Sequence, residues 1–80
     1  MIVPIVMTSG RYRFFFYSSD RAEPCHVHVA SQGRIAKFWL VPVRLERSRG
    51  FSERELLQIQ RAVERNQHRL TEKWNEFFEA

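Results

Sequence analysis

Two histidines, His26 and His28, lie two positions apart in a segment rich in β-branched residues, and they are the residues of this chain best suited to chemistry. On a β-strand, successive side chains alternate between the two faces, so we expect both imidazoles on one face and Cys25, Val27 and Val29 on the other. Imidazole exchanges protons near neutral pH and also binds transition metals. The pair therefore suits acid–base catalysis, metal binding or a polar contact at an interface.

Acid–base catalysis by this pair would have the form of a metal-independent ribonuclease. One imidazole would take the 2′-hydroxyl proton, the other would protonate the leaving group, and an arginine would stabilise the phosphorane. A zinc site needs three or four ligands. The further ligands that the sequence offers have no diagnostic spacing: Asp20, Glu23, Cys25 and His68. We therefore expect no bound metal and no cofactor, and His26 and His28 are the candidate catalytic residues and the only weak metal candidates.

The elements that must position the histidines are predicted to be strands. Residues 11–17 form a strongly β-prone aromatic run, and residues 18–24 are polar and turn-like. The aromatic strand and the histidine strand should therefore pair as an antiparallel hairpin with a fairly long loop. Asp20 and Glu23 lie in that loop, near the histidines.

Three further strands are expected. Residues 34–41 follow a turn at 31–33 and form the third strand, while the alternation of apolar and charged residues over 43–47 suits a short peripheral strand. Residues 2–7 are apolar and β-branched, but Pro4 indicates an edge strand or an extended arm.

The C-terminal part carries a helix signal. Ser52 and Glu55 form a capping box, and no proline or glycine follows. Apolar residues then recur at steps of three, four or seven: Leu56, Ile59, Val63, Leu70, Trp74 and Phe77. This spacing predicts one long helix over about residues 52–78. Asn66 falls on its apolar stripe, as a buried amide with satisfied hydrogen bonds, a contact to the sheet or a slightly exposed gap, of which the first is the commonest.

One helix covers one face of a sheet. The sequence thus predicts a single α+β domain over residues 1–80, with an antiparallel sheet of three to five strands in about residues 1–50 and one long C-terminal helix on one face. The face under the helix should carry Tyr12, Phe14, Phe16, Cys25, Val27, Val29, Phe38 and Leu40. The opposite, uncovered face should carry His26 and His28 together with the predicted binding residues Arg11, Arg13, Phe15, Tyr17, Lys37 and Trp39.

Composition narrows the class of partner. The 80 residues carry a net charge of +4, and through Gly50 there are eight Lys or Arg against three acids. Arginine predominates, and its guanidinium pairs with phosphate or carboxylate, so nucleic acid or an acidic protein is favoured. The single cysteine excludes an internal disulfide, and no apolar run is long enough for a membrane span. We expect a cytoplasmic protein.

Four segments together resemble a known family: the aromatic run 11–17, the histidine segment 23–29, and residues 36–40 and 74–78. They are similar to short bacterial proteins classed as a domain of unknown function, with a Pro-Pro-His-x-His-Val motif after an aromatic strand. Cys25 stands where a second proline is usual. The resemblance implies a component of a two-gene operon, similar to a toxin–antitoxin module, with His26 and His28 as functional candidates.

The sequence thus favours a small basic interaction protein over an enzyme. Its uncovered sheet face would bind a small partner protein or a second copy of the chain, with RNA as a further ligand and no membrane. The alternative is the histidine-based ribonuclease.

Overall fold

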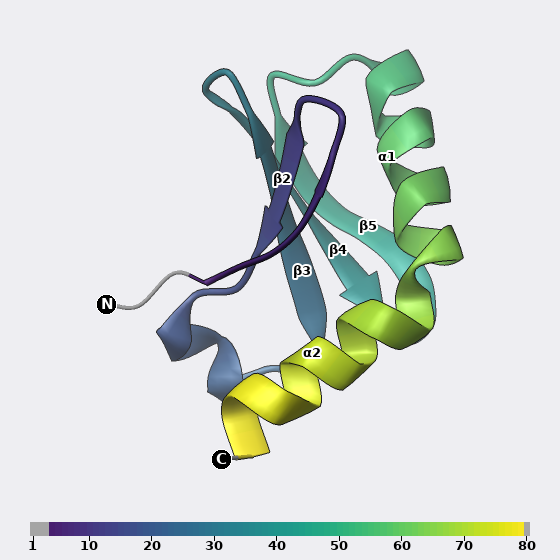
Figure 1. Ribbon diagram of the computed structural model, residues 1–80. Helices are drawn as coiled ribbons and strands as arrows, with labels where there is room; N and C mark the ends of the chain where they lie inside the picture. Colours follow the sequence, from purple (N-terminus) through teal and green to yellow (C-terminus); the bar gives the residue numbers. More distant parts are fainter. Residues whose placement is uncertain (1–3, 80) are drawn as a thin grey trace.

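The structure is a computed structural model that describes residues 4–79. A five-stranded antiparallel sheet, with its strands in sequence order, packs against two helices (Figure 1). The strands are β1 Ile5–Ser9, β2 Tyr12–Phe15, β3 His26–Ser31, β4 Arg34–Leu40 and β5 Val43–Arg49. A short 3₁₀ helix, η1 (Ser18–Ala22), connects β2 to β3, and the helices are α1 (Glu53–Arg65) and α2 (Gln67–Glu79). The predicted α+β fold is confirmed, with five strands.

The strand predictions hold at the level of pairing. The aromatic strand and the histidine strand form the expected antiparallel hairpin, in which Phe14 pairs with Val29 and Phe15 with His28. β1 and β5 are the two edge strands, and β5 extends to Arg49. Residues 2 and 3 of the predicted first strand lie outside the described residues.

The prediction of one long helix is wrong, because the helix divides at Asn66. Asn66 caps α1, its Nδ2 donates to the carbonyl of Ala62 at 2.8 Å, and its own carbonyl accepts from the Leu70 amide at 2.9 Å. A straight helix over 52–78 would be about 40 Å long, whereas the longest extent of the chain is 36 Å. The division lets the second helix turn back across the sheet, as Figure 1 shows.

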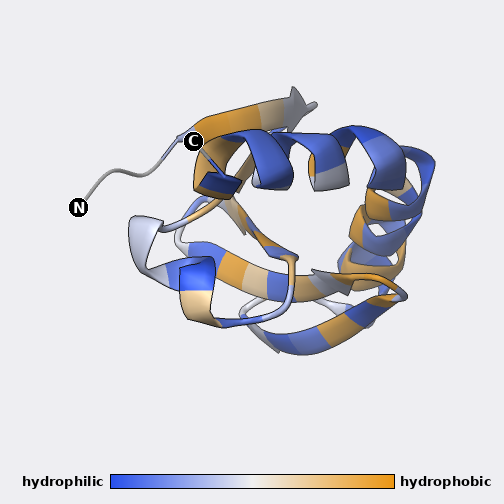
Figure 2. Cartoon of the chain, turned by 90° about the horizontal axis from the view of Figure 1, so that it is seen from below, coloured by the Kyte–Doolittle hydropathy of each residue, from blue (hydrophilic) through white to orange (hydrophobic). Residues whose placement is uncertain are grey.

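The inner face of the sheet, the one beneath the helices, contains the apolar core. Figure 2 shows the hydrophobic stripes of both helices turned toward the sheet and the hydrophilic surfaces turned outward. The fully buried side chains here come from strands, from the chain after β2 and from both helices: Phe14, Phe16, Val27, Val29, Phe38, Leu40, Ile59, Val63 and Leu70. The predicted alternation of faces is correct, and Tyr12 and Cys25 are partly buried against the same core.

The capping box at the start of α1 is present. Ser52 Oγ accepts from the Glu55 amide at 3.2 Å, and the Ser52 amide donates to Glu55 Oε1 at 3.2 Å. The guanidinium of Arg34 on β4 donates to both oxygens of Glu55, at 3.1 and 2.9 Å. Gly50 has a φ of +96°, and a Cβ there would lie 2.6 Å from Cγ of Arg34. Glycine therefore allows Arg34 to join the sheet to the helix.

The outer face of the sheet, opposite the helices, is less open than predicted. Phe15, His26, His28 and Lys37 were expected on an uncovered surface, but their exposed fractions are 8%, 0%, 6% and 6%. The reason is that the segment 17–25 folds back over this end of the sheet (Figure 1). No helix within residues 4–79 has the length and apolar character that crossing a membrane requires.

Candidate functional site

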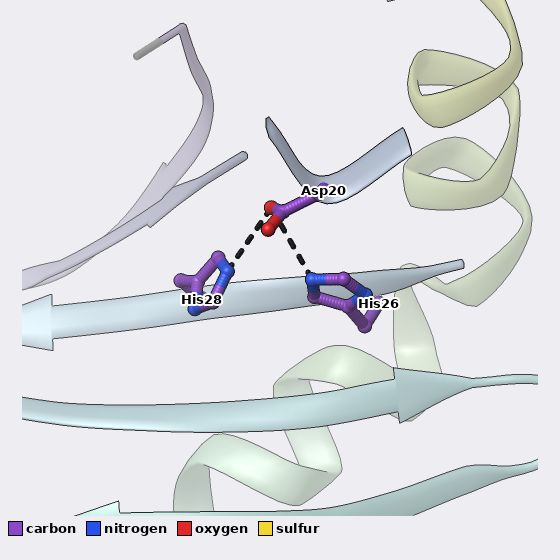
Figure 3. A group of neighbouring side chains, drawn as sticks. All are labelled: Asp20, His26 and His28. Carbon is purple, nitrogen blue, oxygen red and sulfur yellow. Dashed lines mark hydrogen bonds and ion pairs between the residues drawn. The ribbon is translucent and has the colours of Figure 1, made fainter. Parts of the chain in front are cut away.

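Three side chains meet where η1 folds over the start of β3: Asp20, His26 and His28 (Figure 3). Oδ2 of Asp20 lies 3.0 Å from Nε2 of His28 and 3.2 Å from Nε2 of His26. All three residues are buried. The site is therefore a closed carboxylate–bis-imidazole cluster rather than a pair of surface histidines.

Local structure explains how these groups converge. The pleat of β3 turns both imidazoles to the outer face, as their i, i+2 spacing requires. The amide of Tyr17 donates to Oδ2 of Asp20 at 2.8 Å, and the amide of Glu23 donates to the Asp20 carbonyl at 3.0 Å. These two bonds hold the η1 turn so that its carboxylate faces β3. Asp20 was expected near the histidines but was not predicted as a site residue.

His26 is held by its ring environment. Its ring centroid lies 5.6 Å from that of Trp39 and 5.0 Å from that of Trp74. Nδ1 lies 2.9 Å from the carbonyl oxygen of Pro24, and because a carbonyl only accepts, Nδ1 carries a hydrogen. Nε2 is buried and, within residues 4–79, has no partner in hydrogen-bond geometry. The tautomer of His26 is thus set, and its second nitrogen points at Asp20.

His28 is sandwiched by aromatic rings and bonded to the same carboxylate. The Phe15 ring stacks on it at 5.5 Å between centroids, and the Tyr17 ring lies edge-on at 4.6 Å. Burial lowers the pKa of His28, against the opposing effect of the Asp20 charge. Nε2 donates to Asp20, so the neutral ring has its lone pair on Nδ1.

A concavity of about 320 Å³ adjoins His28 on the outer face. We call it the basic concavity. Its lining residues are Tyr17, His28, Ile35, Ala36, Lys37, Arg47, Ser48 and Arg49, with no Asp or Glu among them. The register explains this grouping, because paired residues of antiparallel strands share a face: His28 pairs with Lys37, Lys37 with Arg47 and Ile35 with Arg49.

Lys37 lines the basic concavity, and its charge also acts on His28 of the cluster. Its Nζ forms an ion pair with Glu23 and lies 4.8 Å from the centroid of the Trp39 ring. The hydrogen bond from Lys37 lowers the pKa of Glu23. Part of the lysine charge is therefore neutralised, and Arg47 and Arg49 supply the remaining positive charge of the concavity.

The predicted binding residues divide into three groups. Tyr17 and Lys37 line the basic concavity, and the Phe15 ring stacks on the imidazole of His28. Trp39 is half-buried, and its Nε1–H donates to Glu46 at 2.7 Å. Arg11 and Arg13 are exposed and do not line the concavity.

Arg47 and Arg49 were missed as binding residues, although the sequence shows three arginines within residues 44–49. Their face depends on an irregularity in the pairing of β4 with β5: Phe38 pairs with Leu45, whereas Lys37 pairs with Arg47. The extra residue, Glu46, shifts the alternation so that Arg47 and Arg49 point to the outer face.

A model of the family DUF4160, a domain of unknown function, matches residues 12–75. The chain belongs to this family. The match includes β2 through most of α2, and with it the Asp20 cluster and the basic concavity. A search of curated proteins found no match, and neither did a search of solved structures.

The geometry of this DUF4160 chain bears directly on the ribonuclease alternative. That mechanism needs one imidazole to act as acid and the other as base on the same substrate. His26 has an exposed fraction of 0%, and both of its ring nitrogens point at protein oxygens. His26 therefore does not reach a substrate in this structure, and the two-histidine mechanism lacks one of its two groups.

Proposed function

We propose that this DUF4160 chain binds single-stranded RNA at the basic concavity on the outer face of the sheet. The observation that carries the proposal is the lining of the concavity: two arginines, a lysine, a tyrosine and a histidine with no carboxylate. Phosphate groups are the ligands that such a lining recognises, and arginine pairs with them in a bidentate manner.

The arginines around the concavity are available for phosphate. Within residues 4–79, Arg13, Arg47 and Arg49 form no ion pair, and all three are exposed. Arg13 pairs with Ala30, Ala30 with Ile35 and Ile35 with Arg49, so these positions form one row across the outer face. Arg13 and Arg49 stand at the two ends of this row, and cations at both ends suit a phosphate backbone that runs across the strands.

The size and remaining lining of the concavity suit one nucleotide. Its volume of about 320 Å³ falls at the lower end of the range for small-molecule pockets, about 300–1,000 Å³. Tyr17 is half-buried at its rim and offers a ring on which a base can stack.

The exposed apolar side chains give less support to a protein partner on this face. The large ones within residues 4–79 are spread over three elements and a turn: Ile5 on β1, Val41 in the turn after β4, Leu45 on β5 and Leu57 on α1. An obligate protein interface instead gathers its apolar residues into one patch. The partner protein of a toxin–antitoxin-like operon, implied by the family resemblance, is therefore the second outcome that the experiment must resolve.

The experiment compares two double variants of equal charge. Arg47→Ala/Arg49→Ala removes the cations of the concavity, and Arg61→Ala/Arg69→Ala removes two exposed arginines from the helices. Binding of a fluorescently labelled single-stranded RNA is followed by anisotropy over a series of salt concentrations. We expect the first variant to weaken binding and to reduce the salt slope by about 1.4, which corresponds to two lost contacts at about 0.7 each. The control should retain the wild-type slope.

Equal losses in the two double variants would show only a general attraction between charges and would overturn the assignment of the concavity. A salt-independent response would exclude phosphate recognition. If the chain purifies from its host with a stoichiometric small protein and without RNA, the RNA proposal is overturned and the partner protein is the ligand.

A further inference from the structure

We propose that Asp20, His26 and His28 form a binding site for one divalent transition-metal ion. This site is separate from the RNA contacts proposed above, although His28 also lines the basic concavity. The donor set would be the Asp20 carboxylate oxygen and the two Nε2 atoms. His28 would have to change tautomer, because its Nε2 hydrogen is bonded to Asp20 in this structure and would move to Nδ1 when the ion binds.

The separations within the cluster fit ligands around one ion. Ligand bonds to such metals are about 2.0–2.1 Å long, and two ligands at angles of about 90–109° are then about 2.8–3.4 Å apart. The Asp20 oxygen lies 3.0 Å from one Nε2 and 3.2 Å from the other. All three donor atoms lie within 4.8 Å of one another. Small rotations of the side chains would bring both imidazoles into contact with an ion.

The tautomer of His26 is the form that metal ligands require. Nδ1 donates to the Pro24 carbonyl, which leaves the lone pair of the neutral ring on Nε2. A hydrogen bond from the second ring nitrogen to a backbone carbonyl is the usual support of a metal-bound histidine. The rings of Trp39 and Trp74 fix the plane of the imidazole.

His26 Nε2 also provides a reason for a cation at this place. The atom is fully buried and, within residues 4–79, lacks a partner in hydrogen-bond geometry, although the Asp20 oxygen is 3.2 Å away. A lone pair that faces a carboxylate in a buried site is unfavourable, because the two acceptors repel each other and Nε2 is left without a hydrogen-bond partner. A metal ion bound to both atoms would remove this conflict.

The donor types select the class of metal. Two imidazoles and one carboxylate suit zinc and neighbouring first-row ions, whereas magnesium and calcium prefer oxygen ligands. Three protein ligands leave at least one position for water. The ion would fasten the η1 turn to β3, and through Tyr17 it would define one wall of the basic concavity.

The test measures zinc binding by calorimetry on untagged protein in the His68→Gln background. His68 and Glu72 form an exposed pair at 2.9 Å on α2, and their removal eliminates this surface contribution. We expect one equivalent of zinc to bind. Asp20→Asn and His26→Gln should each weaken zinc binding by more than 10–100-fold, which is the cost of losing a group that only supports a metal ligand. Magnesium should not bind at the same site.

A second measurement does not depend on the folding of buried-site variants. Both tryptophans of the chain have their rings within 5.6 Å of the His26 ring. Cu²⁺, which binds such sites more tightly than zinc does, should quench their fluorescence in the His68→Gln protein, and a chelator should restore it. Zinc should also raise the melting temperature of this protein, because a ligand that binds only the native state stabilises it.

Absence of zinc binding in the His68→Gln protein would overturn the proposal. Equal zinc affinities for folded Asp20→Asn and His68→Gln proteins, or unquenched tryptophans with bound copper, would overturn it equally.

Discussion

The two faces of the sheet bury different kinds of side chain. On the inner face, Phe14, Phe38 and Leu40 lie fully buried beneath both helices. On the outer face, the segment 17–25 places Asp20 over the two histidines and buries all three, while the rest of the face presents arginines. Apolar burial stabilises the inner face without any need for partners, whereas each buried polar group on the outer face needs a specific one.

This difference indicates where stability and function reside. Burial of Asp20 and two imidazoles costs free energy that apolar side chains at the same positions would not cost. Polar groups at such positions indicate a role in recognition rather than in stability alone. Substitutions on the two faces should therefore have opposite signatures, one in the free energy of unfolding and the other in ligand binding.

The largest effect on stability is expected from Phe38→Ala on the inner face. The side chain is fully buried, so its truncation should lower the free energy of unfolding by about 3–5 kcal/mol. On the outer face of the neighbouring strand, Arg47→Ala should change it by less than about 0.5 kcal/mol. Urea denaturation measures both values. Similar losses in the two variants would contradict the separation of the faces.

A smaller effect is expected where the helix layer bends. Asn66→Ala removes the bond from Nδ2 to the Ala62 carbonyl, but alanine favours helix, so the net loss should be about 0.5 kcal/mol. The two helices should stay separate, because Leu70 and Trp74 hold α2 on the core. Thr71→Ala is the matched control, since it removes a similar side-chain bond, to the Gln67 carbonyl at 2.8 Å, that lies within α2. Fusion of the helices, seen as increased helical circular dichroism in Asn66→Ala alone, would show that Asn66 causes the bend.

The smallest effect expected is a pH dependence that originates on the outer face. Burial lowers the pKa of His28 below its ordinary value, so between the two pKa values the unfolded chain binds a proton that the native chain does not. The free energy of unfolding should therefore fall as the pH decreases below about 6.5, the unperturbed pKa of histidine. The measurement is urea denaturation of chelator-treated protein at a series of pH values.

Two variants isolate this contribution. His28→Gln should lose part of the dependence, whereas His68→Gln, which changes an exposed imidazole, should retain it. An unchanged pH dependence in His28→Gln would show that burial does not disfavour the charged form of His28.

The features that the sequence predicted correctly depend on local periodicity. Alternation along the strands placed Phe14, Val27 and Phe38 on one face, and the capping box marked the start of α1. Both follow from backbone geometry, which is the same in every strand and helix. The location of the core was therefore predictable from the sequence.

The features that the sequence did not predict depend on contacts between distant segments. Apolar spacing continued through Asn66, and the direction of α2 depends on the packing of Leu70 and Trp74 on the core. The extra residue in β5 decides the face of Arg47 and Arg49, and no local signal marks it. Asp20 was expected near the histidines, but its contact with both required the fold of the η1 turn.

The most direct test of the outer-face proposal is a nuclear magnetic resonance titration of isotopically labelled chain with a short single-stranded RNA. We expect the amide signals that shift to be concentrated around the basic concavity, at Tyr17, Lys37, Arg47, Ser48 and Arg49. The amide signals of the outward surfaces of α1 and α2 should stay unchanged. Shifts confined to the helices, or no shifts at low salt, would contradict it.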